Sequence, residues 1–187
     1  MKKILGLLSA CLIAMTCNAQ KKFSSATDAN IFTKVQEAAF QYFWDGAEQK
    51  SGLARERVHL DGVYPQNDQQ TVTTGGGGFG VMAILAGIER KFITRAEGLA
   101  RLEKIIQFLE TADRFHGAWP HWLHGESGKV KPFSKYDDGG DLVETSFMLQ
   151  GLLCVRQYFQ NGNAHEKALA ARADKLWKEV DFTWYQN

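Results

Sequence analysis

The sequence predicts an all-α fold built from antiparallel helical hairpins. Apolar residues recur at three- and four-residue spacing in five segments, which is the period of a helix with a buried face. Short turns alternate with long, polar, aromatic loops between these segments, so the long loops should gather at one end. The segments are apolar on more than one side, as in the stacked layers of a barrel or a solenoid.

The first predicted helix covers residues 28–49 and is ended by a Ser-Gly pair. Residues 55–74 are polar and show no helical period, and residues 71–74 are the one candidate strand. Helical spacing returns over residues 79–90.

Thr94 is the predicted N-cap of the next helix, and Glu97, three residues later, completes a capping box. This helix should extend to about Phe115. A long loop over residues 117–138 then carries four aromatic residues among glycine, proline and polar residues. Two more helices are predicted over residues 141–159 and 165–180.

The composition excludes two classes of protein. With 12% aromatic residues and a net charge of +1, the chain does not have the composition of a disordered protein. Lys and Arg number 22 against 21 Asp and Glu, so no nucleic-acid partner is expected. The five Trp, five Tyr and twelve Phe indicate a large core, a sugar-stacking surface, or both.

Residues 1–19 have the pattern of a signal peptide: two lysines, an apolar run, and a small-residue cleavage site that ends at Ala19. The apolar run is shorter than the about 20 residues of a membrane span, so no span is expected. We therefore predict a periplasmic or secreted protein whose exported domain is residues 20–187. A lipid anchor on Cys11 or Cys17 is a less favoured alternative, based on weak lipoprotein-like boxes before each cysteine.

Cys154 is the one cysteine outside this leader, so no internal disulfide is expected. It lies in an apolar helical run and is predicted to be a small buried side chain.

The glycine run at residues 75–80 matches the G-x-G-x-x-G pattern of a dinucleotide-binding turn. A helix follows it where that fold requires a second strand, so no nucleotide cofactor is expected. A helix N-terminus whose glycines allow close approach of backbone or ligand explains the run better.

Residues 116–124 carry three histidines and two tryptophans. The histidine spacing matches no usual zinc pattern, so no metal is expected. Indole rings beside imidazoles suit a carbohydrate cleft, because sugar rings stack on indoles and hydroxyls bind imidazoles. The alternative is that Trp119 and Trp122 are both core residues.

Asp137, Asp141 and Glu144 stand at i, i+4 and i+7, which would place three carboxylates on one helical face. A glycosidase needs a pair of carboxyl groups, one to protonate the leaving oxygen and one to activate water. Two simpler interpretations compete with this one, namely helix N-caps and a solvated acidic face.

The chain carries five long motifs, at residues 55–57 (RER), 72–80 (VTTGGGGFG), 87–90 (GIER), 116–122 (HGAWPHW) and 137–147 (DDGGDLVETSF). These motifs resemble the bacterial glycoamylase-like proteins, which include the β-1,2-glucanases of glycoside hydrolase family 144. The resemblance covers nearly all of residues 30–187 and implies the N-terminal part of an (α/α)6 barrel. It also implies an exported, inverting glycoside hydrolase on β-glucan, with β-1,2-glucan as the expected substrate, no cofactor, and a monomer when complete.

The resemblance further implies roles for individual residues. Asp141 is the candidate general base, and Asp137 and Glu144 are expected to hold substrate or orient water. The positions expected to bind substrate are Arg55, Gly77, Gly78, Phe79, Trp119, His121 and Trp122.

Five helices make less than half of a barrel of six hairpins, and the acid of the family is expected at a glutamate beyond Asn187. We therefore expect a fragment that has no hydrolase activity by itself. Two other functions remain open: a non-catalytic glycan-binding protein, and a polysaccharide lyase on a similar barrel. The lyase is less favoured, because a lyase needs cations and the motif is acidic, with lysines only in the adjoining loop (Lys129, Lys131 and Lys135).

Overall fold

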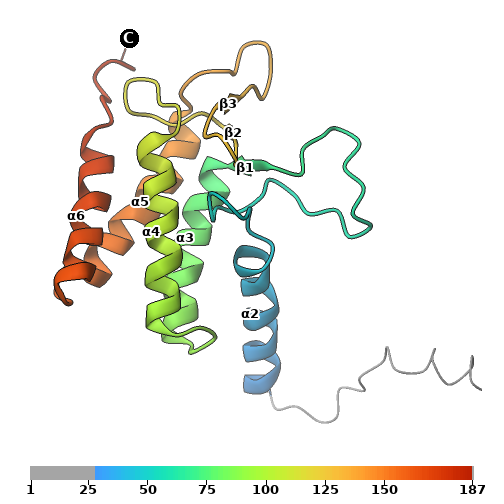
Figure 1. The fold of residues 1–187 in the computed structure, drawn as a ribbon, viewed down its shortest axis with the longest axis vertical. Coiled ribbons are helices and arrows are strands. Elements are labelled where there is room, and N and C mark those ends of the chain that lie inside the picture. The colour runs from blue at the N-terminus through green and yellow to red at the C-terminus, as the bar shows by residue number, and fades with distance from the viewer. Residues whose placement is uncertain (1–27, 187) are drawn as a thin grey trace, which may run out of the picture. The chain divides into compact units, whose positions relative to one another are not determined.

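The computed structural model describes residues 28–186 (Figure 1). The chain divides into two compact units, Met1–Val35 and Gln36–Asn187. The features below belong to the second unit, except that the first helix begins in the first unit. The helices are α2 (Asp28–Trp44), α3 (Thr74–Glu89), α4 (Arg95–Thr111), α5 (Leu142–Phe159) and α6 (Ala164–Lys178), with strands β1 (Thr71–Thr73), β2 (Trp122–His124) and β3 (Val130–Lys131).

The helices form the predicted antiparallel hairpins. α3 and α4 are joined by a turn at residues 90–94, and α5 and α6 by a turn at residues 160–163. The most extensive packing is between α3 and α5, followed by that between α5 and α6. The N-termini of α3 and α5 therefore lie at the end of the hairpins that carries the three strands (Figure 1). Their shared core is apolar and includes Val81, Ile84, Leu102, Ile105, Ile106, Leu109, Met148, Leu152, Val155, Phe159, Leu169 and Leu176.

Glycines allow α3 and α5 to touch backbone to backbone. A Cβ atom on Gly78 would overlap the carbonyl group of Phe147, and one on Gly151 would lie 2.7 Å from the Gly78 carbonyl oxygen. A Cβ on Gly77 would lie 2.9 Å from the Leu53 side chain. Gly77 and Gly78 are thus buried packing positions, which corrects their prediction as substrate-binding residues.

The three strands form one antiparallel sheet in the order β1-β2-β3. Thr73 pairs with Trp122, and Trp122 pairs with Lys131. The candidate strand at residues 71–74 is confirmed at 71–73. The expectation of no strand in the loop over residues 117–138 is wrong, because β2 is stabilised by pairing with β1, about fifty residues earlier.

Several helix ends differ from their predictions. α2 ends at Trp44 rather than at residue 49, since a turn follows in which Asp45 and Gly46 both donate to the Gln41 carbonyl. α4 ends at Thr111 rather than near Phe115. The capping box of Thr94 and Glu97 is confirmed.

Cys154 is exposed, which corrects its prediction as a buried residue. Leu152 and Val155 take the buried positions of that turn of α5. The predicted signal peptide, with Cys11 and Cys17, lies outside the described residues. Across residues 28–186, no helix combines the length and the apolar character needed to cross a membrane.

Candidate active site

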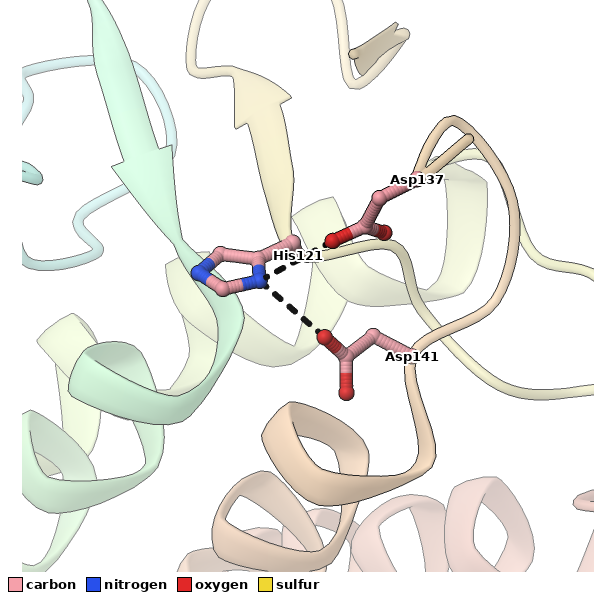
Figure 2. Close-up of side chains that lie close together, drawn as sticks. All are labelled: His121, Asp137 and Asp141. Atoms are coloured by element: carbon pink, nitrogen blue, oxygen red, sulfur yellow. Dashed lines mark hydrogen bonds and ion pairs between the residues drawn. The ribbon is translucent and has the colours of Figure 1, made fainter. Parts of the chain in front are cut away.

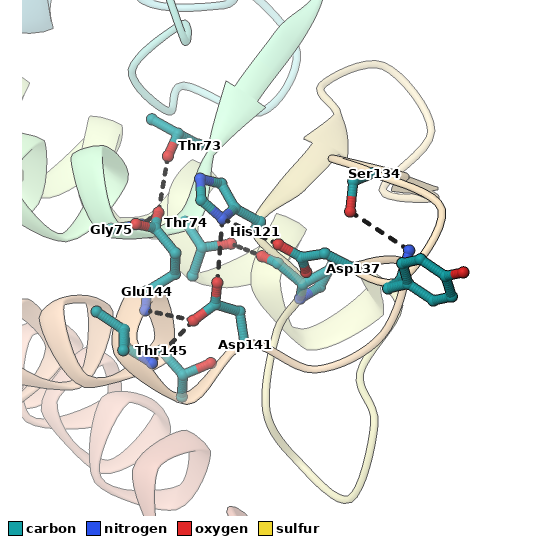
Figure 3. A network of polar contacts seen from close by, with 12 residues as sticks. Thr73, Thr74, Gly75, His121, Ser134, Asp137, Asp141, Glu144 and Thr145 are labelled. Atoms are coloured by element: carbon teal, nitrogen blue, oxygen red, sulfur yellow. Dashed lines mark hydrogen bonds and ion pairs between the residues drawn. The ribbon is translucent and has the colours of Figure 1, made fainter.

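The segment from Trp119 to His121 is held between the starts of α3 and α5. The Asp141 N–H donates to the Trp119 carbonyl (2.9 Å), and the Thr74 N–H donates to the His121 carbonyl (3.1 Å). The Thr74 hydroxyl donates to the Pro120 carbonyl. These three hydrogen bonds place the His121 ring beside the two helix N-termini (Figure 3).

The His121 ring meets two carboxylates there. Its Nδ1 lies 3.0 Å from Asp141 Oδ2 and 3.5 Å from Asp137 Oδ2, while its other nitrogen points away from both (Figure 2). An ionised carboxylate can only accept, so Nδ1 carries the hydrogen and donates it. The side chains of His121, Asp137 and Asp141 are 25%, 33% and 17% exposed, so the group is shielded but reachable from solvent.

Asp141 also caps α5. Its Oδ1 accepts the N–H groups of Val143 (2.8 Å) and Glu144 (3.0 Å), while Oδ2 faces His121. The helix-cap interpretation of this residue is therefore confirmed, and the same carboxylate takes part in the cluster with His121. Bonds on both of its oxygens fix the orientation of this carboxylate.

Glu144 reaches from α5 to the start of α3. Its Oε2 accepts the Gly75 N–H at 2.7 Å and the Thr73 hydroxyl at 2.9 Å (Figure 3). The N-terminus of a helix favours a negative charge, so the contact suits a carboxylate. A Cβ on Gly75 would lie 2.8 Å from that oxygen, which explains the glycine there.

The three carboxylates do not share one helical face, which corrects the prediction from their spacing. Asp137 lies in the turn before α5, where its N–H donates to the Ser134 carbonyl (3.2 Å). Asp141 is the N-cap, and Glu144 alone lies inside the helix. Asp137 and Asp141 are brought together by His121, whereas Glu144 points to α3.

The two tryptophans of the loop have different environments. Trp119 is fully buried, and its Nε1–H donates to the Leu109 carbonyl at 3.2 Å. It is a core residue, which corrects its prediction as a sugar-binding surface. Trp122 is partly exposed on β2, with its ring edge-on to that of His121 at 5.8 Å between centroids.

The remaining predicted positions, Arg55 and Phe79, make contacts with other residues. The backbone of Arg55 forms an isolated antiparallel β-bridge with Val72 of β1, and the Arg55 Nη1 donates to the Gln69 carbonyl at 3.1 Å. Phe79 is 48% exposed on α3 and contacts the ring of Phe147 at 5.1 Å between centroids.

Phe133 belongs to the site but was not among the predicted residues. Its ring stacks on that of His121, with centroids 4.2 Å apart and planes 19° apart, and meets Trp122 edge-on at 4.8 Å. The sequence signal that could have found it is an aromatic residue in a polar loop, four positions before Asp137.

The cluster has the donor types of a metal site. The ligand atoms of His121, Asp137 and Asp141 all lie within 4.8 Å of one another. The 3.0 Å separation between His121 Nδ1 and Asp141 Oδ2 is nevertheless that of a direct hydrogen bond, which accounts for the close approach.

Helical hairpins of this kind also build the barrels of the solved glucanases that the chain resembles. The chain is a homologue of the β-1,2-glucanases of this kind and has the fold of a part of their barrel. No family model matches the chain.

Three relatives carry this assignment. The endo-β-1,2-glucanase from Chitinophaga pinensis, solved with sophorotriose and glucose, is 69% identical over 86% of this chain, with a TM-score of 0.85. The solved β-1,2-glucanase from Parabacteroides distasonis is 51% identical over 86% of this chain, with a TM-score of 0.79. An exo β-1,2-glucooligosaccharide sophorohydrolase from the same species is 53% identical over 161 residues. The chain spans 38%, 22% and 21% of the length of these three proteins.

Proposed function

We propose that this chain forms part of the active site of an exported, inverting glycoside hydrolase that acts on β-1,2-glucan. One observation carries the proposal: the carboxylates of Asp137 and Asp141 meet at His121, next to the partly exposed Trp122, and Glu144 lies at the adjoining start of α3. Three of the relatives above 50% identity are named for β-1,2-glucans or β-1,2-glucooligosaccharides, which supports the substrate class.

Asp141 is the best-placed base. In an inverting reaction, the base takes a proton from the water that attacks the anomeric carbon, and a separate acid protonates the leaving oxygen. The α5 cap and the His121 Nδ1–H hold Asp141 in one orientation before substrate binds, which favours an accurately placed water.

Asp137 is too close to Asp141 to serve as that acid. The facing oxygens of both residues lie within 4.8 Å of each other and of His121 Nδ1. An inverting pair needs a separation of about 6.5–9.5 Å to leave room for the water. Asp137 therefore has the role of holding a sugar hydroxyl or orienting the water, and the acid comes from another residue of the active protein.

A non-catalytic glycan-binding function is the second candidate. It is favoured by the hydrogen bonds that already occupy Glu144 Oε2 and both oxygens of Asp141. Carboxylates committed to such bonds can still accept from sugar hydroxyls, because each oxygen has two lone pairs. Trp122 would supply the stacking surface for either function.

Binding and catalysis are tested separately. In the purified chain, sophorotriose should shift the amide resonances of residues 121–123 and 141–145 and the Trp122 indole resonance. Laminaritriose, the β-1,3 isomer, is the matched control. Resonances that do not respond to sophorotriose, or that respond equally to both sugars, would contradict the proposed substrate.

Catalysis is tested in a chimera in which residues 36–186 replace the corresponding part of the Chitinophaga pinensis endo-β-1,2-glucanase. The chimera should release sophorooligosaccharides whose new reducing ends have the α configuration, as inversion requires. Binding of sophorotriose without any hydrolysis would favour the non-catalytic function. A β product would rule out inversion.

Export is tested on the chain made with its own N-terminus. Mass spectrometry of the protein recovered outside the cytoplasm should find a polypeptide that begins at Gln20. A lipid-modified N-terminal cysteine would instead support an anchor at Cys11 or Cys17.

A further inference from the structure

The turn over residues 133–137 contacts His121 from two directions. At one end of the turn, the Phe133 ring lies flat on the imidazole, with centroids 4.2 Å apart and planes at 19°. At the other end, Asp137 Oδ2 lies 3.5 Å from His121 Nδ1. The imidazole therefore meets the turn at one face and at one nitrogen.

Backbone hydrogen bonds join the two ends of this turn. The Phe133 N–H donates to the Asp137 carbonyl at 2.9 Å, and the Asp137 N–H donates to the Ser134 carbonyl at 3.2 Å. The Phe133 ring and the Asp137 carboxylate are consequently fixed relative to each other. The Phe133 ring also contacts the Trp122 ring edge-on, with centroids 4.8 Å apart, so the turn packs against β2.

The orientation of an imidazole ring is not set by its own torsion preferences. The χ2 angle of histidine has a broad distribution, so neighbours decide where Nδ1 points. Asp137 and Asp141 both attract the Nδ1–H, at 3.5 and 3.0 Å, and neither of them limits tilting of the ring. A flat aromatic contact does limit it, because tilting would break the stacked arrangement.

We propose that Phe133 is a positioning residue of the site, which sets the plane of the His121 ring and so directs Nδ1–H to Asp141. The role of this positioning in glucan binding rests on the function proposed above. Phe133 is 48% exposed, so one part of its ring stays open to solvent while the other supports His121.

The test uses the nuclear magnetic resonance signals of the His121 ring protons in the free chain. The ring current of a stacked phenyl group shifts these protons upfield. In Phe133→Leu, and in Phe133→Met as a second variant of similar volume, they should move downfield, while Phe133→Tyr should restore the upfield position. Phe182→Leu changes a phenylalanine that is 42% exposed outside the site, and it should leave the His121 signals unchanged.

The affinity for sophorotriose provides the second readout. Loss of the aromatic contact should weaken binding about 3- to 10-fold in Phe133→Leu, with recovery in Phe133→Tyr. His121 signals that stay in place in folded Phe133→Leu and Phe133→Met would overturn the positioning role. Absence of sophorotriose binding to the unmodified chain would instead overturn the proposed function, and the His121 signals would still decide whether Phe133 stacks on the imidazole.

Discussion

Two helices at one end of the hairpins begin with the same sequence pattern and are closed in the same way. At the start of α4, Glu97 accepts the Thr94 N–H (2.7 Å) and donates its own N–H to the Thr94 hydroxyl (3.2 Å). At the start of α6, Glu166 accepts the Asn163 N–H (2.9 Å) and donates its own to the Asn163 side chain (3.0 Å). Each of these helices satisfies its own terminus with a local pair.

At the opposite end of the hairpins, α5 also begins with an N-cap residue and a glutamate three residues later, but this glutamate does not close its own helix. Asp141 caps its own helix, but Glu144, three residues later, turns away and binds Gly75 and Thr73 of the neighbouring chain segment. The N-cap of α3 is Thr73, whose side chain makes no cap bond of its own. One motif thus serves two purposes: in α4 and α6 the glutamate accepts from the N-cap of its own helix, and in α5 it accepts from the start of another helix.

The largest effect is expected for Asp141→Asn in the chimera. Asparagine is as good an N-cap as aspartate, and Asn163 already has that role in α6, so the helix should stay capped. Turnover of β-1,2-glucan should fall by about two to four orders of magnitude, which is the usual contribution of a positioned base. Kinetics and thermal melting are measured together. More than a tenth of the parent turnover would mean that Asp141 is only a helix cap.

The next effect tests the bond between the two helices. Glu144→Ala leaves the Gly75 N–H and the Thr73 hydroxyl without their acceptor, so the free energy of unfolding should fall by about 2–4 kcal/mol. Urea denaturation of the purified chain measures it. Glu37→Ala in α2 is the control, because that glutamate is exposed on the helix surface. Equal losses in the two variants would remove the distinction between the two ends.

Trp122→Ala tests whether the end with the shared termini is the one that binds sugar. If a glucosyl ring stacks on this indole, sophorotriose binding should weaken by about 1–3 kcal/mol in calorimetry. Trp184→Ala is the matched control, since Trp184 is 57% exposed and stacks on His116 instead. A lower melting temperature with unchanged affinity would make Trp122 a core residue.

The smallest effect belongs to the local boxes. Hydrogen bonds from the Thr94 hydroxyl and N–H lower the pKa of Glu97, so the box stabilises the fold above the ordinary pKa of a glutamate and less as pH falls through the lowered value. Glu97→Gln should therefore lower the melting temperature slightly at pH 7 and not at pH 2. A pH-independent difference would contradict the assignment to an ionised box.

The helices were predictable because each buries apolar residues at helical spacing, and that signal is local. The strands were less so. β2 and β3 are two to three residues long, and Trp122 is placed in a strand by its pairing with Thr73, far away in the sequence. Residues so distant leave no periodic pattern in a short window.

The sequence brought forward the residues of the His121, Asp137 and Asp141 cluster, but it did not predict how they are arranged. Residues at i, i+4 and i+7 share a face only when all of them lie inside a helix. Here α5 begins after Asp141, and Asp137 lies in the turn at residues 133–137, so the spacing does not apply. Trp119 and Trp122 differ for a similar reason. The hydrogen-bond acceptor of the buried Trp119 indole is the backbone carbonyl of Leu109, which has no side-chain signature in the sequence.

The glycine contact between α3 and α5 sets the distance between the two helices that carry the site. Gly78 and Gly151 let the two backbones touch, and a side chain at either position would push the helix axes apart. The 2.7 Å hydrogen bond from Gly75 to Glu144 joins the same two helices, about one turn from Gly78. Its length therefore depends on the distance between the helices that the glycine contact sets. Gly78 and Gly151, which are packing positions, therefore limit the substitutions that keep Glu144 in place at the start of α3.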